Sequence, residues 1–327
     1  MRFAIVGAGA IGAFLGARLA QAGEDVFLIA RGPHLRSMQA NGVRVRSPEG
    51  NFKAHPTATD DYAAIGPVDF VFLTVKAHSL TEIAPQLSPL LGLDTAVVSA
   101  QNGIPWWYFQ NHGGPWEGTR LESVDPGGAI AGAIEPHRII GCIVYPSAVI
   151  VEPGVIEHIE GNRFTIGELN GESSDRCKSL SSILIAAGFR SPIRRNIRHD
   201  LWVKLMGNVV FNPMSALTGV TLVEMATHPE AAAIARAAMA EADAVAQGLG
   251  VDLGVTIDQR MAGAASVGRH KTSMLQDIEM GRPLELESVV GAVLELGDMQ
   301  GIPMPHTRTL YACTKLLAQR LSSVPVN

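Results

Sequence analysis

The feature that most constrains this 327-residue chain is the glycine-rich stretch Gly7-Ala8-Gly9-Ala10-Ile11-Gly12 near its start. Arg2–Val6 before it has the continuous apolar pattern of a buried strand, and Ala10–Ala22 after it has apolar residues at helical spacing. In such a unit the first glycine allows a tight turn, the second lets the backbone approach a pyrophosphate, and the third lets helix and strand pack closely. The helix N-terminus then offers unpaired N–H groups to the phosphates. We therefore expect Gly7–Gly12 to bind a dinucleotide.

The same segment has a second interpretation, a signal peptide, because Met1-Arg2 is followed by an uncharged run that reaches Ala17. Glycines at positions 7, 9 and 12 would break an apolar signal helix. A second strand pattern, Val26–Ala30, also follows at once. Both features favour the dinucleotide interpretation.

Further apolar runs predict a layered α/β domain. Asp69–Val75 and Thr95–Ala100 are continuous rather than alternating, and helical segments such as Ser79–Leu91 separate the runs. This arrangement is typical of a parallel sheet covered on both faces. Short β-branched runs between Ile139 and Leu169 indicate antiparallel strands added to that sheet.

After Asn196 the pattern becomes helical. Apolar residues recur at three-to-four spacing in Leu201–Val210, Pro229–Gly248, Thr256–Ala265, Leu284–Met299 and Thr307–Leu321. We therefore expect an α/β protein with a Rossmann-type doubly wound sheet in residues 1–195 and an all-α domain in residues 196–327. The last two of these helices are candidates for the contact surface of a homodimer.

Composition restricts the partners and the compartment. The net charge is −5 without a long basic block, which argues against nucleic acid or an anionic membrane. No apolar stretch approaches the ~20 uncharged residues that span a bilayer. The cysteines at 142, 177 and 313 are far apart, and the ten histidines show no ligand-like spacing. We therefore expect no disulfide, no metal site and a reducing, cytoplasmic location.

The end of the second strand indicates which dinucleotide binds. NAD-specific sites usually place an Asp or Glu there to hold the ribose 2′-hydroxyl. Here the strand ends in Arg31, while Glu24 and Asp25 lie at its other end. A guanidinium suits a 2′-phosphate through paired charge-assisted hydrogen bonds, so we expect NADP(H). The alternative is that Arg31 is an ordinary surface cation.

Polar residues also follow the next two expected strands. Lys76 comes after Asp69–Val75, and Asn102 comes shortly after Thr95–Ala100. Ligands of doubly wound sheets gather at the carboxyl ends of the strands, so we expect Lys76 and Asn102 to face the cofactor. A surface loop position is the alternative for each.

A polar stripe opens the helical domain. Lys204, Asn208 and Asn212 are spaced so that they share one face of an otherwise apolar helix. Buried amides must find partners, so this stripe is a candidate binding surface, with a solvent-facing stripe as the alternative. Pro213 predicts that the helix ends or kinks after Asn212.

With these residues assembled, the chain resembles the ketopantoate reductase (2-dehydropantoate 2-reductase) family over nearly its whole length. A further motif, Thr272-Ser273-Met-Leu-Gln-Asp277 followed by Glu285, would alone indicate only an N-cap serine and surface acids. The resemblance is carried by Gly7–Gly12, Val75-Lys76-Ala77, Asn102-Gly103, Leu201-Trp-Val-Lys204-Leu, Asn208, Asn212-Pro213 and Ser273–Asp277 with Glu285. It implies an oxidoreductase that uses NADPH to reduce 2-dehydropantoate to (R)-pantoate in pantothenate and coenzyme A biosynthesis.

The resemblance also implies roles for single residues. Lys204 donates the proton and is catalytic together with Glu285, which would lie against the cofactor ribose. The other implied roles are substrate binding by Asn208, Asn212 and Ser273, contact with both substrate and nicotinamide by Asn102, and cofactor binding by Lys76 and Arg31. The chemistry agrees, because hydride attack on a ketone carbon leaves a negative oxygen that an ammonium can stabilise and protonate. Burial also lowers the pKa of a lysine toward the working pH.

Two departures leave the substrate open. The loop from Ile104 to Gly128, with Trp106, Trp107 and Trp116, is longer than in compact members, and could serve as a lid, a dimer contact or packing. Thr221-Leu222 stand where compact members carry a substrate-binding asparagine. Another branched 2-keto acid is therefore an alternative substrate.

Two other classes fit less well. Opine-type enzymes use a histidine-centred site, and His199, five residues before Lys204, would point elsewhere on the helix. A non-catalytic NADP-binding regulator would be expected to have lost Lys204, the asparagines or Glu285, and all are present.

Overall fold

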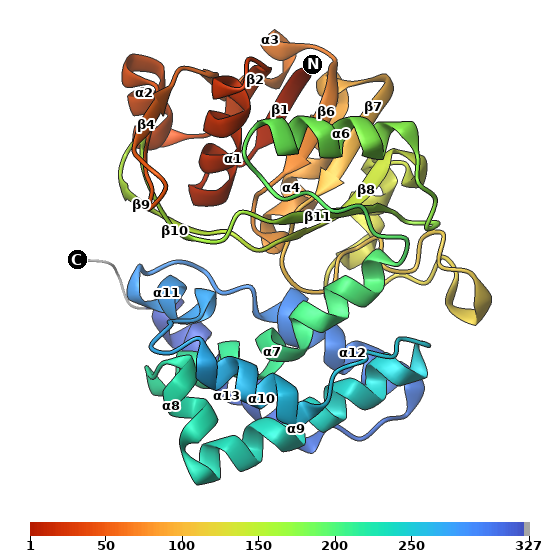
Figure 1. Cartoon of the computed structure of the whole chain (residues 1–327). Coiled ribbons are helices and arrows are strands. Elements are labelled where there is room, and N and C mark those ends of the chain that lie inside the picture. Colours follow the sequence, from red (N-terminus) through yellow and green to blue (C-terminus); the bar gives the residue numbers. More distant parts are fainter. Residues whose placement is uncertain (324–327) are drawn as a thin grey trace. The chain divides into compact units, whose positions relative to one another are not determined.

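The computed structural model describes residues 1–323, which form two compact units (Figure 1). Unit 1 contains residues 1–101, 105–120 and 125–197. Unit 2 contains the short segments Asn102–Ile104 and Leu121–Val124 together with the chain from Arg198 onward. The main transition lies close to the expected boundary at 195, but the two short segments of the expected first domain cluster with the second. Residues 324–327, at the end of the expected second domain, lie outside the described residues.

Unit 1 is built on a seven-stranded sheet of order β11-β8-β7-β6-β1-β2-β5. Its strands are β1 Arg2–Val6, β2 Asp25–Ile29, β5 Thr57–Thr59, β6 Val68–Leu73, β7 Leu91–Ser99, β8 Ile139–Val144 and β11 Phe164–Glu168. All neighbouring strands are parallel except β8 and β11. Because β2 and β6 flank β1, the winding of the sheet reverses between β1 and β6, which is where ligands of such sheets bind. The expected doubly wound sheet is confirmed.

Helix α1 (Ala10–Gln21) lies against strands of this sheet on one side and against a second sheet on the other (Figure 1). Small residues allow the close approach: a Cβ at Gly16 would lie 2.4 Å from the Leu28 side chain. Phe14, Leu15 and Leu19 complete the core on this helix. The helix that carries the glycine-rich turn is therefore held on both faces.

The second sheet has the order β4-β3-β10-β9. Its strands are β3 Val43–Arg46, β4 Phe52–Ala54, β9 Ser147–Glu152 and β10 Val155–Glu160. The expectation that all strands between 139 and 169 join the parallel sheet is therefore wrong for β9 and β10. The physical reason is the burial pattern, because β3 alternates buried and exposed residues and β9 is nowhere fully buried, as in a sheet covered on one face.

The expected helix at 79–91 is also different. It consists of the 3₁₀ turn Ala77–Ser79, the single α turn α4 (Leu80–Ile83) and the 3₁₀ stretch Ala84–Leu90. Pro85 and Pro89 lack the N–H groups that a regular helix needs here. The connection still covers the sheet, since Leu80, Ile83, Leu87 and Leu90 are buried.

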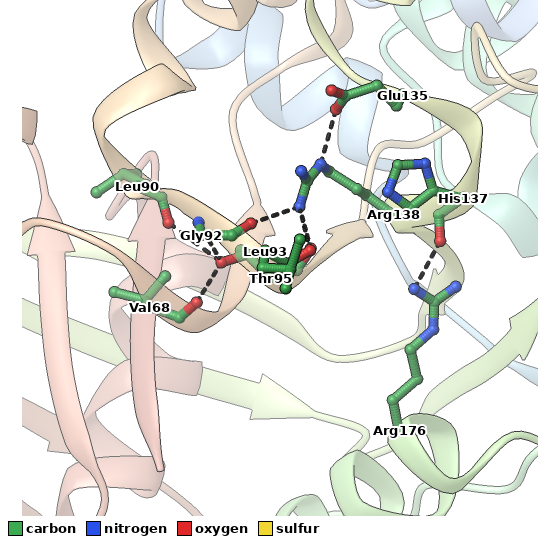
Figure 2. A network of polar contacts seen from close by, with 9 residues as sticks. All are labelled: Val68, Leu90, Gly92, Leu93, Thr95, Glu135, His137, Arg138 and Arg176. Atoms are coloured by element: carbon green, nitrogen blue, oxygen red, sulfur yellow. Dashed lines mark hydrogen bonds and ion pairs between the residues drawn. The ribbon is translucent and has the colours of Figure 1, made fainter.

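Side-chain hydrogen bonds fix the start of β7 (Figure 2). The Thr95 hydroxyl donates to the Val68 carbonyl at 2.5 Å and accepts from the Gly92 N–H at 2.8 Å. The Arg138 guanidinium donates to the Gly92 carbonyl and to the Glu135 carboxylate, each at 2.7 Å. These bonds hold β7 beside β6, so the carboxyl ends of the two strands are adjacent.

Unit 2 is helical (Figure 1). Its helices are α7 Ile197–Thr218, α8 Leu222–Thr227, α9 Pro229–Gly248, α10 Ile257–Ser266, α11 Ser273–Glu279, the π-helical turn Glu287–Gly291, α12 Ala292–Gln300 and α13 Pro305–Ser323. Helix α9 contacts α8, α10, α12 and α13, and its buried face is mainly alanine, which lets the neighbouring helices approach closely. The expectation of an all-α second domain is confirmed, since all its regular elements from Ile197 onward are helical in the described residues. Within residues 1–323, no helix combines the length and hydropathy needed to cross a membrane.

Pro213 lies inside α7, which continues to Thr218, so of the two expected outcomes, an end or a kink, the end is excluded. The turn around the proline is held by two side-chain hydroxyls, because Ser215 donates to the Asn212 carbonyl at 2.9 Å and Thr218 donates to the Met214 carbonyl at 2.7 Å. The residues from Val209 to Ala216 are also buried, and this packing outweighs the loss of one helical hydrogen bond.

Candidate active site

In unit 1 the glycine-rich turn follows β1 and is shaped by the end of β6. Gly7 has φ +96°, and a Cβ there would lie 2.4 Å from the Val75 side chain. A Cβ at Gly12 would lie 2.4 Å from the Gly7 carbonyl oxygen and 2.5 Å from Thr74 Oγ1. The first and third glycines are therefore required by close packing.

The second glycine faces open space. A Cβ at Gly9 would meet nothing closer than the Gly7 carbonyl oxygen at 3.9 Å. Gly9 is also the N-cap of α1, which has no side-chain cap and no acidic residue in its first turn within the described chain. Its first N–H groups and the positive end of its dipole are therefore available to an anion. Gly7–Gly12 thus fit the pyrophosphate of a dinucleotide.

Arg31 lies two residues after the last residue of β2, Ile29, and is the exposed N-cap of α2 (Gly32–Asn41). Burial raises the pKa of Tyr62, and the positive charge of Arg31 opposes this shift, so the two side chains share one corner of unit 1. The sequence analysis missed Tyr62, which follows the three-residue strand β5 and carries no motif of its own.

His34 was missed as well. Its Nδ1 accepts a hydrogen bond from the Gly154 N–H at 3.0 Å, which joins α2 to the turn between β9 and β10. Burial lowers the pKa of His34, and an interaction with the Ala8 backbone opposes that shift. The ring therefore joins α2 to the second sheet, and its lowered pKa favours the neutral form that accepts this hydrogen bond.

The ends of β6 and β7 are joined by Gln101. Its Nε2 donates to the Leu73 carbonyl at 2.7 Å, and its Oε1 accepts from the Ser99 hydroxyl at 2.9 Å. Lys76, half-buried, begins the 3₁₀ turn after β6. Gln101 was overlooked because its neighbour Asn102 carries the motif, although its position at a strand end was the available signal.

Asn102 belongs to unit 2, where it meets Asn208 of α7. The Asn208 Nδ2 group donates to Asn102 Oδ1 at 3.2 Å. Next to it, Gly103 has φ +88°, and a Cβ there would lie 2.2 Å from the Ser288 carbonyl oxygen. That same oxygen accepts the Ile104 N–H at 2.8 Å. The segment is thus held by one side-chain and one backbone hydrogen bond.

Ser288 lies in the π-helical turn that follows Glu285. The Glu285 carbonyl accepts the Val289 N–H at 3.2 Å, and the change of helical register coincides with the bond between the Ser288 carbonyl and Ile104. Interruptions of this kind are frequent at functional sites. Asn102 and Glu285, far apart in sequence, are therefore anchored to the same turn.

The second short segment is held by the same helical stretch. The Glu295 carboxylate accepts the backbone N–H groups of Glu122 and Ser123 at 2.8 and 2.9 Å. Both ends of the tryptophan-containing loop are therefore attached to residues 287–300. Of the loop tryptophans, Trp106 and Trp107 are buried and Trp116 is partly exposed.

The α7 stripe has graded burial. Lys204 and Asn208 are half-buried, and Asn212 is only 4% exposed.

Ser273 is exposed at the start of α11, but the N-cap is Thr272, whose Oγ1 accepts the Leu275 N–H at 3.2 Å. The expectation of an N-cap serine is therefore wrong, and the Ser273 hydroxyl stands outside the cap.

The candidate residues divide cleanly between the units. Unit 1 holds Gly7–Gly12, Arg31 and Lys76, and unit 2 holds Asn102, Lys204, Asn208, Asn212, Ser273 and Glu285. The described part of the chain has no group of three or more His, Cys, Asp or Glu side chains arranged to hold a metal ion.

A doubly wound sheet with an uncapped glycine-rich turn, continued by a helical unit with a lysine and amide stripe, defines the class of dinucleotide-dependent oxidoreductases. Residues 3–106 match the family model described as ketopantoate reductase PanE/ApbA, and residues 196–318 match its C-terminal counterpart. The chain belongs to the ketopantoate reductase family.

Individual relatives agree over the full length. A 2-dehydropantoate 2-reductase of Mesorhizobium japonicum is 48% identical, and the alignment covers 97% of this chain and 98% of the relative. A proposed ketopantoate reductase of Ralstonia solanacearum has a solved structure with a TM-score of 0.94 and 40% identity, covering 98% of both chains. A D-mandelate dehydrogenase solved with NADH and anilino(oxo)acetate is 21% identical with a TM-score of 0.84, over 98% of this chain and 99% of its own, and so shares the fold.

Proposed function

We propose that this chain reduces 2-dehydropantoate to (R)-pantoate with NADPH, a step of pantothenate and coenzyme A biosynthesis. The observation that carries the proposal is the 48% identity to a 2-dehydropantoate 2-reductase over almost the whole of both chains. The candidate residues that the family resemblance singled out are all present and divide between a dinucleotide-binding unit and a helical unit. We assign substrate binding and proton transfer to the helical unit.

The cofactor assignment rests on residues of unit 1. The uncapped N-terminus of α1 and the open position at Gly9 suit a pyrophosphate. Arg31, exposed at the end of β2 where NAD-specific sites carry an acid, suits a 2′-phosphate. NADPH supplies the hydride when it is bound, and Lys76 is assigned to cofactor binding.

Lys204 is assigned the proton. Hydride addition to the ketone carbon converts the carbonyl oxygen to an alkoxide, and the Lys204 ammonium stabilises this charge and donates the proton that completes the alcohol. Asn208, Asn212 and Ser273 bind the carboxylate and hydroxyl oxygens of the substrate without adding a charge. Glu285 is the second catalytic candidate and is assigned to the cofactor ribose.

Asn102 is assigned to both ligands. Its Oδ1 already accepts a hydrogen bond from Asn208. Its amide nitrogen therefore supplies the donors for substrate and nicotinamide, in an orientation that Asn208 fixes.

The test is a steady-state assay that follows the loss of NADPH absorbance with 2-dehydropantoate and a panel of other 2-keto acids. We expect 2-dehydropantoate to have the highest specificity constant. Tight NADPH binding without turnover of any keto acid would instead support the non-catalytic regulator.

One observation favours a different branched 2-keto acid as the second candidate. Thr221, near the position where compact relatives carry a substrate-binding asparagine, has its backbone N–H and its hydroxyl bonded to the Glu224 carboxylate in a capping box. Its hydroxyl is therefore a poor replacement for that amide. A higher specificity constant for a keto acid that lacks the 4-hydroxyl group would favour this candidate.

We also propose a compartment and an oligomeric state for the protein. Cys142 and Cys177 are buried, Cys313 is exposed, and none of the three is in a disulfide within the described residues, which suits a reducing cytoplasm. We also propose a homodimer, because Leu316 of α13 is 68% exposed and Leu321 is 43% exposed on the same terminal helix. Sedimentation equilibrium measures the oligomeric state directly.

A further inference from the structure

A buried hydroxyl pair joins α7 to α11 inside unit 2. Ser215 Oγ and Thr272 Oγ1 are 2.5 Å apart, and the two residues are 0% and 5% exposed. Ser215 lies one turn beyond Asn212 on α7, and Thr272 directly precedes Ser273 of α11. The pair therefore connects two elements that each carry a candidate substrate-binding residue.

The direction of each hydrogen bond follows from counting protons. The Ser215 hydroxyl donates its single proton to the Asn212 carbonyl oxygen at 2.9 Å, so it must accept from Thr272. Thr272 donates to Ser215 and accepts the Leu275 N–H at 3.2 Å. The result is a chain from Leu275 through Thr272 and Ser215 to Asn212 in which each hydroxyl donates once and accepts at least once.

Such a chain has a mechanical consequence. An unpaired buried hydroxyl is costly, so α11 is held at the one position relative to α7 that satisfies all the groups. The cap at Thr272 also sets where α11 begins, and therefore where the Ser273 hydroxyl lies. Asn212 is 4% exposed and has little freedom to compensate for a shift.

We infer that Ser215 and Thr272 are positioning residues for substrate binding, which fix Ser273 of α11 relative to Asn212 of α7 without touching the substrate themselves. The inference rests on the proposed function, because it takes Asn212 and Ser273 to be substrate ligands. It assigns the hydroxyl pair a role in KM for the keto acid, beyond its role in folding.

The main variants are Thr272→Val, Thr272→Ser and Ser215→Ala. Valine has the shape of threonine but has lost the cap acceptor and the donor to Ser215, whereas serine keeps both. Ser215→Ala removes the acceptor on α7. The matched control is Thr218→Ala, which removes a similar hydroxyl-to-carbonyl bond on the same helix, to Met214, and that bond lies wholly within α7.

KM and kcat for 2-dehydropantoate, the Kd for NADPH and the melting temperature are measured for each purified full-length variant. We expect Thr272→Val and Ser215→Ala to raise KM for the keto acid about tenfold or more, since small misplacements of binding groups have effects of this size. The NADPH Kd stays at the wild-type value, because the hydrogen bonds of Ser215 and Thr272 go to Asn212, Leu275 and each other, and none of these residues is assigned to the cofactor. We expect the KM for the keto acid to equal the wild-type value in both Thr272→Ser and Thr218→Ala.

A purely structural role predicts something different. The melting temperature of Thr272→Val and Ser215→Ala would then fall while KM for the keto acid stayed unchanged in the folded fraction, and this result would overturn the inference while leaving the proposed function intact. If the wild-type protein itself turns over no keto acid, the proposed function fails and the inference fails with it. If Thr272→Val does not fold, Ser215→Ala decides between the two roles through the same KM measurement.

A double variant, Ser215→Ala with Thr272→Val, tests whether the hydroxyls act as one unit. We expect KM to rise by no more than in the worse single variant, because either substitution already breaks the chain. Multiplicative effects on KM would mean that the two residues act independently and would contradict the linked arrangement.

Discussion

At the scale of single residues, Lys204 carries the largest chemical consequence. General acid catalysis by a positioned side chain contributes roughly 10²–10⁴-fold to a rate. We therefore expect Lys204→Ala to lower kcat about 1000-fold while the Kd for NADPH, measured by fluorescence titration, changes little. Lys178 is the matched control, because it is an exposed lysine paired with Asp175 on α6 (Asp175–Ala186). Equal activity in Lys204→Ala and wild type would remove the proton donor from the mechanism.

Arg31 is the residue that we expect to distinguish NADPH from NADH. Charge-assisted hydrogen bonds to a 2′-phosphate are worth roughly 1.5–3 kcal/mol, so Arg31→Ala should raise KM for NADPH about 10- to 100-fold. KM for NADH, which lacks this phosphate, should change little. Arg36→Ala, another exposed arginine on α2, serves as the control. A parallel rise in KM for both cofactors would mean that Arg31 supports the fold rather than the phosphate.

Residues with a local motif could be predicted from the sequence, and residues defined by distant partners could not. Gly7 and Gly12 follow from the strand–turn–helix pattern, although their contacts with the end of β6 became visible only in the structure. The Ser215–Thr272 pair has no local signature, and Gln101 has only its position at a strand end, because their roles depend on carbonyls and hydroxyls elsewhere in the chain.

At the scale of elements, periodicity located the long helices and buried strands but not their interruptions. Helix α9 begins and ends where its apolar spacing predicted. Pro213 does not end α7, because tertiary packing and the Ser215 hydroxyl outweigh the local effect of proline. The π-helical turn at 287–291 could not be foreseen, since its register is tied to the Ile104 N–H from a distant loop.

Gly103 packs directly against the π-helical turn, so a side chain at this position should displace the Asn102–Ile104 segment. Gly103→Ala places a methyl group against the Ser288 carbonyl and strains a backbone with φ +88°. The Asn102–Ile104 segment must then move away from the turn, which weakens both the Ile104 hydrogen bond and the Asn102–Asn208 contact. We expect kcat/KM for the keto acid to fall about 10- to 100-fold.

The control for this variant is Gly113→Ala. Gly113, in the loop that follows, has a similar φ of +73°, but a Cβ there would have no neighbour within 4 Å among the described residues. This variant therefore carries the backbone strain without the collision. Similar losses of kcat/KM in Gly103→Ala and Gly113→Ala would show that strain, and not displacement of Asn102, explains the effect.

At the scale of the whole molecule, the sequence predicted a sheet-containing unit and a helical unit, and Asn102 fell within the residue range of the first. Asn102 follows strand β7, so chain order placed it with the sheet. Its contacts with Asn208 and the adjacent Gly103–Ser288 packing place it with the helical unit. Division into two units also means that unfolding need not be a single two-state transition.

Unit 1 contains an ion pair between the buried Glu168 carboxylate and the partly exposed Arg176 guanidinium. The Glu168 carboxylate, 8% exposed, accepts two hydrogen bonds from Arg176 at 2.6 Å and one from Ser174 at 2.5 Å. Arg176 also donates to the His137 carbonyl (Figure 2). Burial alone would raise the pKa of Glu168, but the hydrogen bonds from Arg176 and Ser174 outweigh it and lower the pKa below its ordinary value of 4.5.

A carboxylate whose pKa is lowered by folding stabilises the folded state fully above its unfolded pKa, and this stabilisation is lost as the pH falls through the lower folded value. We therefore expect the melting transition of unit 1 to fall steeply below about pH 4.5 in wild type, and less steeply in Glu168→Gln. At pH 7 the variant should be less stable by about 3 kcal/mol, because removing one partner leaves Arg176 without its counter-charge.

Glu135→Gln is the control: its carboxylate pairs with Arg138 but is 56% exposed, so its effect at pH 7 should stay below about 1 kcal/mol. Calorimetry across the pH series decides the matter, since identical acid profiles for wild type and Glu168→Gln would exclude this ion pair as a source of the pH dependence.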